Sequence, residues 1–181
     1  MPIYEIQPES LIPLQEVTFA SKKILEEDIQ RIFRTYIDAI APDTFVLAEE
    51  FSDWADSWRS IDLLCLDKAA NLVVVEVKRT QDGGHMELQA IRYAAMISKM
   101  TFADAVAAHA KFLIKHGTQG TDAEAAILGF LGVDEIKENQ FAQDVRIILV
   151  SADFSKEINN NFSLVAKRKR PRHSVRTTAC I

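Results

Sequence analysis

The chain has 181 residues, 48% of them hydrophobic and 26% charged, with a formal net charge of −5 and two cysteines. This composition is that of a globular protein with one domain of ordinary size, and it excludes disordered, fibrous and disulfide-framework classes. No apolar run approaches the length of a membrane span and the N-terminus has no signal-peptide pattern, so we expect a cytoplasmic protein without a membrane segment.

Charge is spread unevenly along the chain. Six Lys and Arg residues fall within residues 167–176, and no Asp or Glu follows Glu157. Residues 1–166 therefore carry 15 basic and 26 acidic side chains, a balance that argues against non-specific binding of nucleic acid. We expect an N-terminal extension over residues 1–20, one domain over residues 21–166 and a solvated basic tail over residues 167–181.

Hydrophobic periodicity predicts helices and strands in a definite order after residue 20. The first helix is expected over residues 21–40, with Ser21 as its N-cap and Pro42 just beyond its end. Further helices are expected over residues 85–100, 102–116 (capped by Thr101), 121–130 (capped by Thr121), 134–142 and 156–165. Strands are expected over residues 44–50, 61–66, 72–78 and 144–150. Three early strands, intervening helices and a late buried strand indicate an α/β fold with a mixed central sheet.

Two of these strands carry acidic residues inside apolar runs. If the loop between them is symmetric about Ala69, Leu66 faces Leu72 and Asp62 faces Glu76 across the hairpin. Directly opposed side chains lie about 5 Å apart at Cβ, and like charges so placed are destabilising. We therefore expect a cation between these two carboxylates.

Hard oxygen ligands without a neighbouring Cys or His favour Mg²⁺ or Mn²⁺ over Zn²⁺. The backbone carbonyl of Val77 is a candidate further ligand, and Lys78, two residues beyond Glu76, points to the same side of the strand. A metal of this kind can orient a phosphodiester and activate a water for attack on its phosphorus. Lys78 is a candidate to position or deprotonate that water, or to stabilise the charge that develops on phosphorus. The alternative is a polar strand end in which Glu76 and Lys78 form an ordinary ion pair.

Other candidates surround this hairpin in the sequence. Gln89 and Tyr93 are four residues apart, so they share one helix face and can line the same site. Glu50, or its neighbour Glu49, ends the preceding strand and is a candidate metal ligand, directly or through water. Glu26 and Glu27 on the first helix are either surface charges, which we favour, or further groups that reach the metal. Trp54 and Trp58 form either a platform on which bases stack or a lid over the core, and we favour the lid.

With these residues placed, the chain resembles the PD-(D/E)XK nuclease superfamily, which has a restriction-endonuclease-like fold. The resemblance rests on Asp62, the triplet Glu76-Val77-Lys78 and the segment from Gln89 to Tyr93, which is similar to the Gln-x-x-x-Tyr motif of RecB-type exonucleases. The same stretch is similar to the catalytic domains of branched-DNA and mismatch endonucleases. Ile61 stands where the name motif has proline.

The resemblance implies an αβββαβ core, dependence on Mg²⁺ or Mn²⁺, and hydrolysis of DNA phosphodiester bonds. It implies catalytic roles for Asp62, Glu76 and Lys78, with Gln89 and Tyr93 beside them. A homodimer is compatible with cutting two strands, although no sequence feature indicates one. The alternative function is a catalytically inactive module of the same fold that binds nucleic acid or protein.

Overall fold

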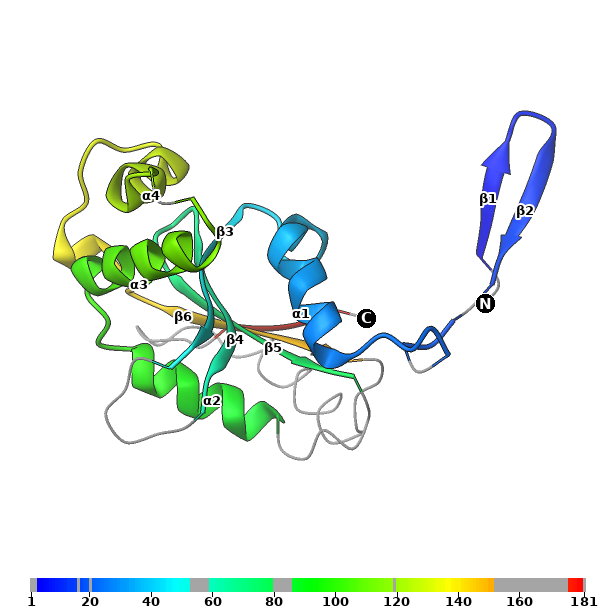
Figure 1. Cartoon of the computed structure of the whole chain (residues 1–181), viewed down its shortest axis with the longest axis horizontal. Coiled ribbons are helices and arrows are strands. Elements are labelled where there is room, and N and C mark those ends of the chain that lie inside the picture. Colours follow the sequence, from blue (N-terminus) through cyan, green and yellow to red (C-terminus); the bar gives the residue numbers. More distant parts are fainter. Residues whose placement is uncertain are drawn as a thin grey trace.

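The structure is a computed structural model that describes residues 3–15, 17–19, 21–52, 59–79, 86–118, 120–151 and, for the backbone alone, 176–180. Its centre is a five-stranded sheet in the order β3-β4-β5-β6-β7 (Figure 1). The strands are β3 (Thr44–Phe51), β4 (Ile61–Asp67), β5 (Leu72–Lys78), β6 (Val145–Ser151) and β7 (Arg176–Cys180). The first three are antiparallel, whereas β6 runs parallel to β5 and β7 runs parallel to β6. The predicted mixed sheet is therefore confirmed.

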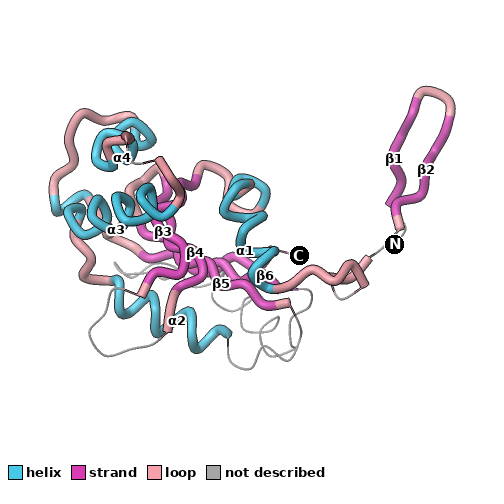
Figure 2. Tube along the Cα trace, viewed as in Figure 1, coloured by secondary structure: helices cyan, strands magenta, loops and turns pink. Residues whose placement is uncertain are grey.

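Helices cover both faces of this sheet (Figures 1 and 2). On one face, α1 (Glu26–Thr35) and the 3₁₀ turn η1 (Ile37–Ala39) pack against the odd-numbered apolar residues of β4 and β5. On the other face lie α2 (Met86–Ile97), α3 (Phe102–Lys115) and α4 (Ala123–Leu131). Because β4 and β5 are buried on both faces, they read as continuous apolar runs. The order of α1, three strands, α2 and β6 matches the expected αβββαβ core, with α3 and α4 added before β6.

The helix boundaries correct three predictions. The first helix begins at Glu26 rather than Ser21, because Lys23 has φ 56° and the Asp28 carboxylate accepts a hydrogen bond from Leu25 N at the helix start. Ser21 instead exchanges side chain–backbone hydrogen bonds with Thr18. The helix expected from residue 121 is capped by Asp122 rather than Thr121, and residues 134–142 contain only the 3₁₀ turn η2 (Glu138–Gln140). The predicted Thr101 cap of α3 is confirmed.

The hairpin register agrees with the prediction over its paired part. Leu66 pairs with Leu72 and Leu63 pairs with Val75, as symmetry about Ala69 requires. The β3–β4 pairing contains a β-bulge between Val46 and Ala48, which shifts the register of the rest of β3 by one residue.

Two terminal segments differ from the body of the chain. Residues 176–180 form β7 at the sheet edge, where the sequence predicted a solvated tail. Near the N-terminus, β1 (Ile3–Gln7) and β2 (Ser10–Leu14) form a hairpin that stands apart from the sheet in Figure 1 and exposes its apolar side chains. No helix among the described residues is long and apolar enough to cross a membrane.

We expect Leu64→Ala to lower the free energy of unfolding by about 3 kcal/mol, because Leu64 is fully buried in the core between β4 and the α2 face. Urea unfolding of the purified protein measures this. Leu11→Ala in the exposed hairpin is the control and should change stability by less than about 0.5 kcal/mol. Equal losses in the two variants would contradict the assignment of the core.

Candidate functional site

The strand β4 leaves its regular pairing at Asp62. The β4–β5 register ends at the pair Leu63–Val75, so it does not include Asp62. Asp62 is also absent from the register between β4 and β3. Ile61 packs in the same core cluster as Leu64, although strict alternation along a strand would place it on the opposite face. The Asp62 carboxylate accepts a hydrogen bond from Val77 N at 2.7 Å through its Oδ2 atom. A side-chain oxygen therefore binds the β5 backbone where the regular ladder has ended.

Glu76 lies beside this break, on the next strand, with none of its surface exposed. Neither of its carboxylate oxygens has a hydrogen-bond partner within the part of the chain that the structure describes. The nearest cation is Lys78, whose Nζ lies 3.4 Å from Glu76 Oε1. A buried carboxylate with so little compensation is costly, and such groups are found mainly where a ligand, an ion or a proton completes them.

Burial favours the protonated forms of both carboxyl groups. Burial raises the pKa of Glu76 to about 8, and the negative charge of Asp62 adds to this increase. Burial raises the pKa of Asp62 to about 6, opposed by the hydrogen bond from Val77 N. Burial alone would lower the pKa of Lys78, but its hydrogen bond to Glu26 and the surrounding carboxylates give a net increase. The lysine is therefore a cation at neutral pH.

Glu26, for which the sequence left a surface charge and contact with the metal as alternatives, lies against Lys78. Its Oε1 lies 2.9 Å from Lys78 Nζ, and its Oε2 accepts a hydrogen bond from Arg79 N at 3.0 Å. Glu26 opens α1, and the packing of α1 against the end of β5 brings its carboxylate to Lys78. No local sequence signal marks this contact, because the two residues are 52 positions apart.

The predicted pair on α2 also lies at this end of the sheet. Tyr93 is 2% exposed, and its hydroxyl accepts a hydrogen bond from Gln89 Nε2 at 3.0 Å. Burial raises the pKa of Tyr93, and the charges of Glu76 and Asp62 raise it further. The tyrosine hydroxyl is thus within electrostatic reach of both carboxylates.

The two glutamates of β3 bind other partners. Glu50 is absent from the register with β4 and has φ 51°, and its carboxylate lies 2.9 Å from Lys115 Nζ on α3. Glu49 Oε2 accepts a hydrogen bond from Arg34 Nη1 at 2.8 Å and lies 3.1 Å from His116 Nε2. Glu49 therefore joins α1, β3 and α3 rather than the carboxylate pair.

The oxygen donors present fit a hard divalent cation, which would neutralise the unpartnered Glu76 oxygens. Asp62 and Glu76 supply two carboxylates, and Val77 lies in the same segment with its N–H bound to Asp62. Among the described residues, no group of three or more His, Cys, Asp or Glu side chains is arranged to hold a metal ion. Trp54 and Trp58 lie outside the described residues.

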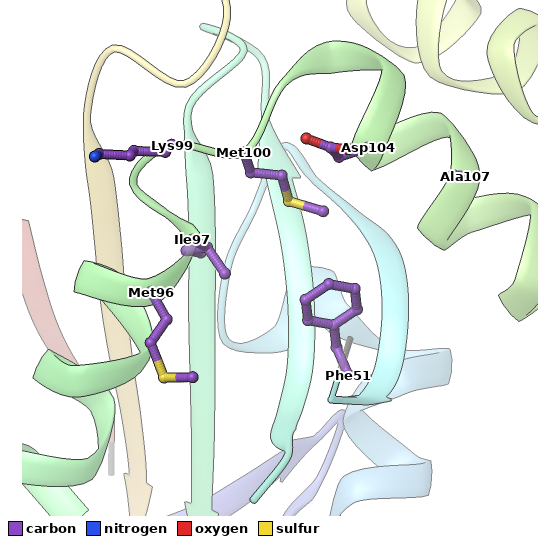
Figure 3. Close-up of a pocket in the computed structure, with 7 residues that line it drawn as sticks. All are labelled: Phe51, Met96, Ile97, Lys99, Met100, Asp104 and Ala107. Carbon is purple, nitrogen blue, oxygen red and sulfur yellow. The ribbon is translucent and has the colours of Figure 1, made fainter. Parts of the chain in front are cut away.

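A pocket of about 280 Å³ lies between the end of β3, the end of α2 and α3 (Figure 3). Apolar groups from three elements line it, and Lys99 and Asp104 add polar atoms; the apolar residues are Phe51, Met96, Ile97, Met100 and Ala107. Phe51 pairs with Ile61, the neighbour of Asp62, but neither Asp62 nor Glu76 lines the pocket.

Comparisons with known proteins give one structural likeness. No family model matches the chain, and no curated protein matches its sequence. A solved structure described as an EndoMS–dsDNA2 complex is similar over 94% of this chain, with 14% sequence identity and a TM-score of 0.47. The chain spans about 50% of the length of that protein chain.

The raised pKa of Glu76 predicts that the metal-free protein becomes less stable as pH rises. The unfolded chain loses this proton near 4.5 and the folded protein near 8, so folding retains the proton between those values. Stability from this group is complete below about pH 4.5 and is lost as pH approaches about 8. Glu76→Gln, which cannot ionise, should therefore gain stability over wild type, reaching on the order of 4–5 kcal/mol at the upper end.

Urea unfolding in the presence of a chelator, repeated across this pH range, measures the difference. Glu135→Gln replaces an exposed glutamate and should follow the wild-type pH profile. Parallel profiles for wild type and Glu76→Gln would show that Glu76 is not a strained buried carboxylate.

Proposed function

We propose that this protein is a metal-dependent nuclease that hydrolyses DNA phosphodiester bonds with Mg²⁺ or Mn²⁺. The observation that supports the proposal most strongly is the buried Asp62–Glu76 pair next to Lys78, in which neither Glu76 oxygen accepts a hydrogen bond from any residue that the structure describes. Two ionisable groups buried at a strand end destabilise the fold when they are charged, so a purely structural role does not explain their presence there.

The proposed metal ligands are Asp62, Glu76, the backbone carbonyl of Val77 and Glu50. Asp62 and Glu76 form the inner part of this set because both are held at the break in the hairpin. Glu50 is the outer member, because its carboxylate forms an ion pair with Lys115. It would bind the metal only after leaving Lys115, or through a bridging water. A bound divalent ion would orient a phosphodiester and lower the pKa of a water.

Lys78 acts in this proposal as a fixed positive charge. Its net pKa shift is upward, so it is a poor general base at neutral pH and a good partner for an anionic oxygen. It is therefore proposed to hold the attacking water in place and to stabilise the charge that develops on phosphorus. Gln89 and Tyr93 supply an amide and a hydroxyl that bind a phosphate oxygen or a water.

We propose DNA as the substrate because the sequence contains a motif that resembles those of DNA nucleases. Its residues are Asp62, Glu76, Lys78, Gln89 and Tyr93. The acidic balance of residues 1–166 makes the bound cation important for recruiting a polyanion. A second candidate is an inactive module of the same fold. It is favoured by the lack of a third ligating side chain in the described metal site and by the pairing of Lys78 with Glu26.

The metal-binding part of the proposal predicts that wild type binds Mn²⁺ and that Asp62→Ala or Glu76→Ala weakens binding at least about tenfold, since each removes a carboxylate ligand. Titration followed by Mn²⁺ electron paramagnetic resonance measures this directly. Glu135→Ala is the matched control and should bind as wild type does. A wild-type protein that binds no divalent ion would rule out the proposed metal site.

The catalytic part predicts that Lys78→Ala lowers cleavage by about 10²-fold or more while Mn²⁺ binding is retained, because the lysine is not a ligand. Cleavage is measured on single-stranded, double-stranded and branched DNA. Full activity in the variant would exclude a catalytic role for Lys78. Intact DNA of every form in the presence of bound metal would favour the inactive module.

A further inference from the structure

Helix α1 contacts both strands of the site through two side chains one turn apart. Glu26 binds the end of β5 through Lys78 and Arg79, as described above. Gln30 reaches β4, where its Nε2 donates a hydrogen bond to the backbone carbonyl of Asp62 at 2.9 Å. Gln30 is 8% exposed, so this contact is shielded from water and its loss leaves a buried acceptor without its donor.

The Gln30 contact falls on a residue of β4 that has left the regular ladder. Asp62 is absent from the register with β3 and from that with β5, although Ile61 and Leu63 both pair with β3 and Leu63 also pairs with β5. A central strand residue normally has its backbone groups satisfied by its neighbours. At Asp62 the amide of Gln30 binds the carbonyl, while the carboxylate binds Val77 N on the other strand.

We propose that Gln30 is a positioning residue for Asp62: its amide holds the Asp62 peptide out of the regular ladder and so fixes the carboxylate in the orientation that a metal ion requires. This inference rests on the proposed function. Gln30 does not touch the metal or the substrate. It acts through the Asp62 main chain, much as groups behind a metal ligand set the orientation of that ligand.

A purely structural role for Gln30 makes a different prediction. If the amide only satisfies a buried carbonyl, its removal lowers stability and leaves the metal affinity of the folded protein unchanged. If the amide positions Asp62, its removal weakens metal binding in molecules that remain folded. The two roles are separated by comparing variants of equal stability.

The test variant is Gln30→Met, which keeps the length of the side chain and removes its N–H donor. The control is Ile29→Val, which trims a buried neighbour on α1 that has no bond to Asp62. We expect Gln30→Met to weaken Mn²⁺ binding by about 10-fold to 100-fold. Ile29→Val should bind Mn²⁺ as wild type does, even where urea unfolding shows a similar loss of stability.

A second readout uses cleavage at increasing Mn²⁺. Excess metal should restore most of the activity of Gln30→Met, because its defect lies in metal affinity, and should not restore Lys78→Ala. Gln30→Asn retains an amide that is one methylene too short for the 2.9 Å contact, and it should behave as Gln30→Met does. It replaces that variant if the methionine side chain prevents folding.

The outcomes distinguish this inference from the function on which it rests. If wild type binds Mn²⁺ and Gln30→Met and Gln30→Asn bind it equally well, the positioning role is wrong while the metal site stands. If wild type binds no Mn²⁺, the proposed function itself fails.

Discussion

The site depends on one constraint, which is the cost of burying two neighbouring carboxylates away from water. Asp62 and Glu76 lie where β4 and β5 stop pairing, and burial raises the pKa of each. Their charged forms repel each other, so a proton or a cation at this end of the sheet would relieve that repulsion. The neighbouring polar contacts, from Val77 N and Lys78, offset part of this cost.

The apolar sheet is what makes that burial possible. Leu63–Leu66 of β4 and Leu72–Val75 of β5 are completely buried, and helices cover both faces. Burying each such side chain contributes about 1.5–3 kcal/mol, which is enough in sum to hold Glu76 in the same strand. The helices then bring polar groups to the strand ends from opposite faces, α1 with Glu26 and Gln30, and α2 with Tyr93.

The acidic residues near the site separate into distinct roles. Glu49 forms a network with Arg34 and His116 that ties β3 to α1 and α3, and Glu50 pairs with Lys115. Glu26 instead binds Lys78 directly. This end of the sheet therefore combines an inner pair of carboxylates, the Lys78 cation and an acidic residue from α1.

The sequence by itself determined the strands β3 to β6, the mixed α/β class and the hairpin register from Leu63–Val75 to Leu66–Leu72, because alternation and loop symmetry are local properties. The predicted pairing of Asp62 with Glu76 is not part of that register, which ends one residue earlier. It also placed Gln89 and Tyr93 on one helix face. Only the tertiary structure decided the contacts of Glu26 and Gln30, the departure of Asp62 from the ladder and the addition of β7. Those features depend on how α1 and the C-terminal strand pack against residues far away in the chain, and no local pattern records such packing.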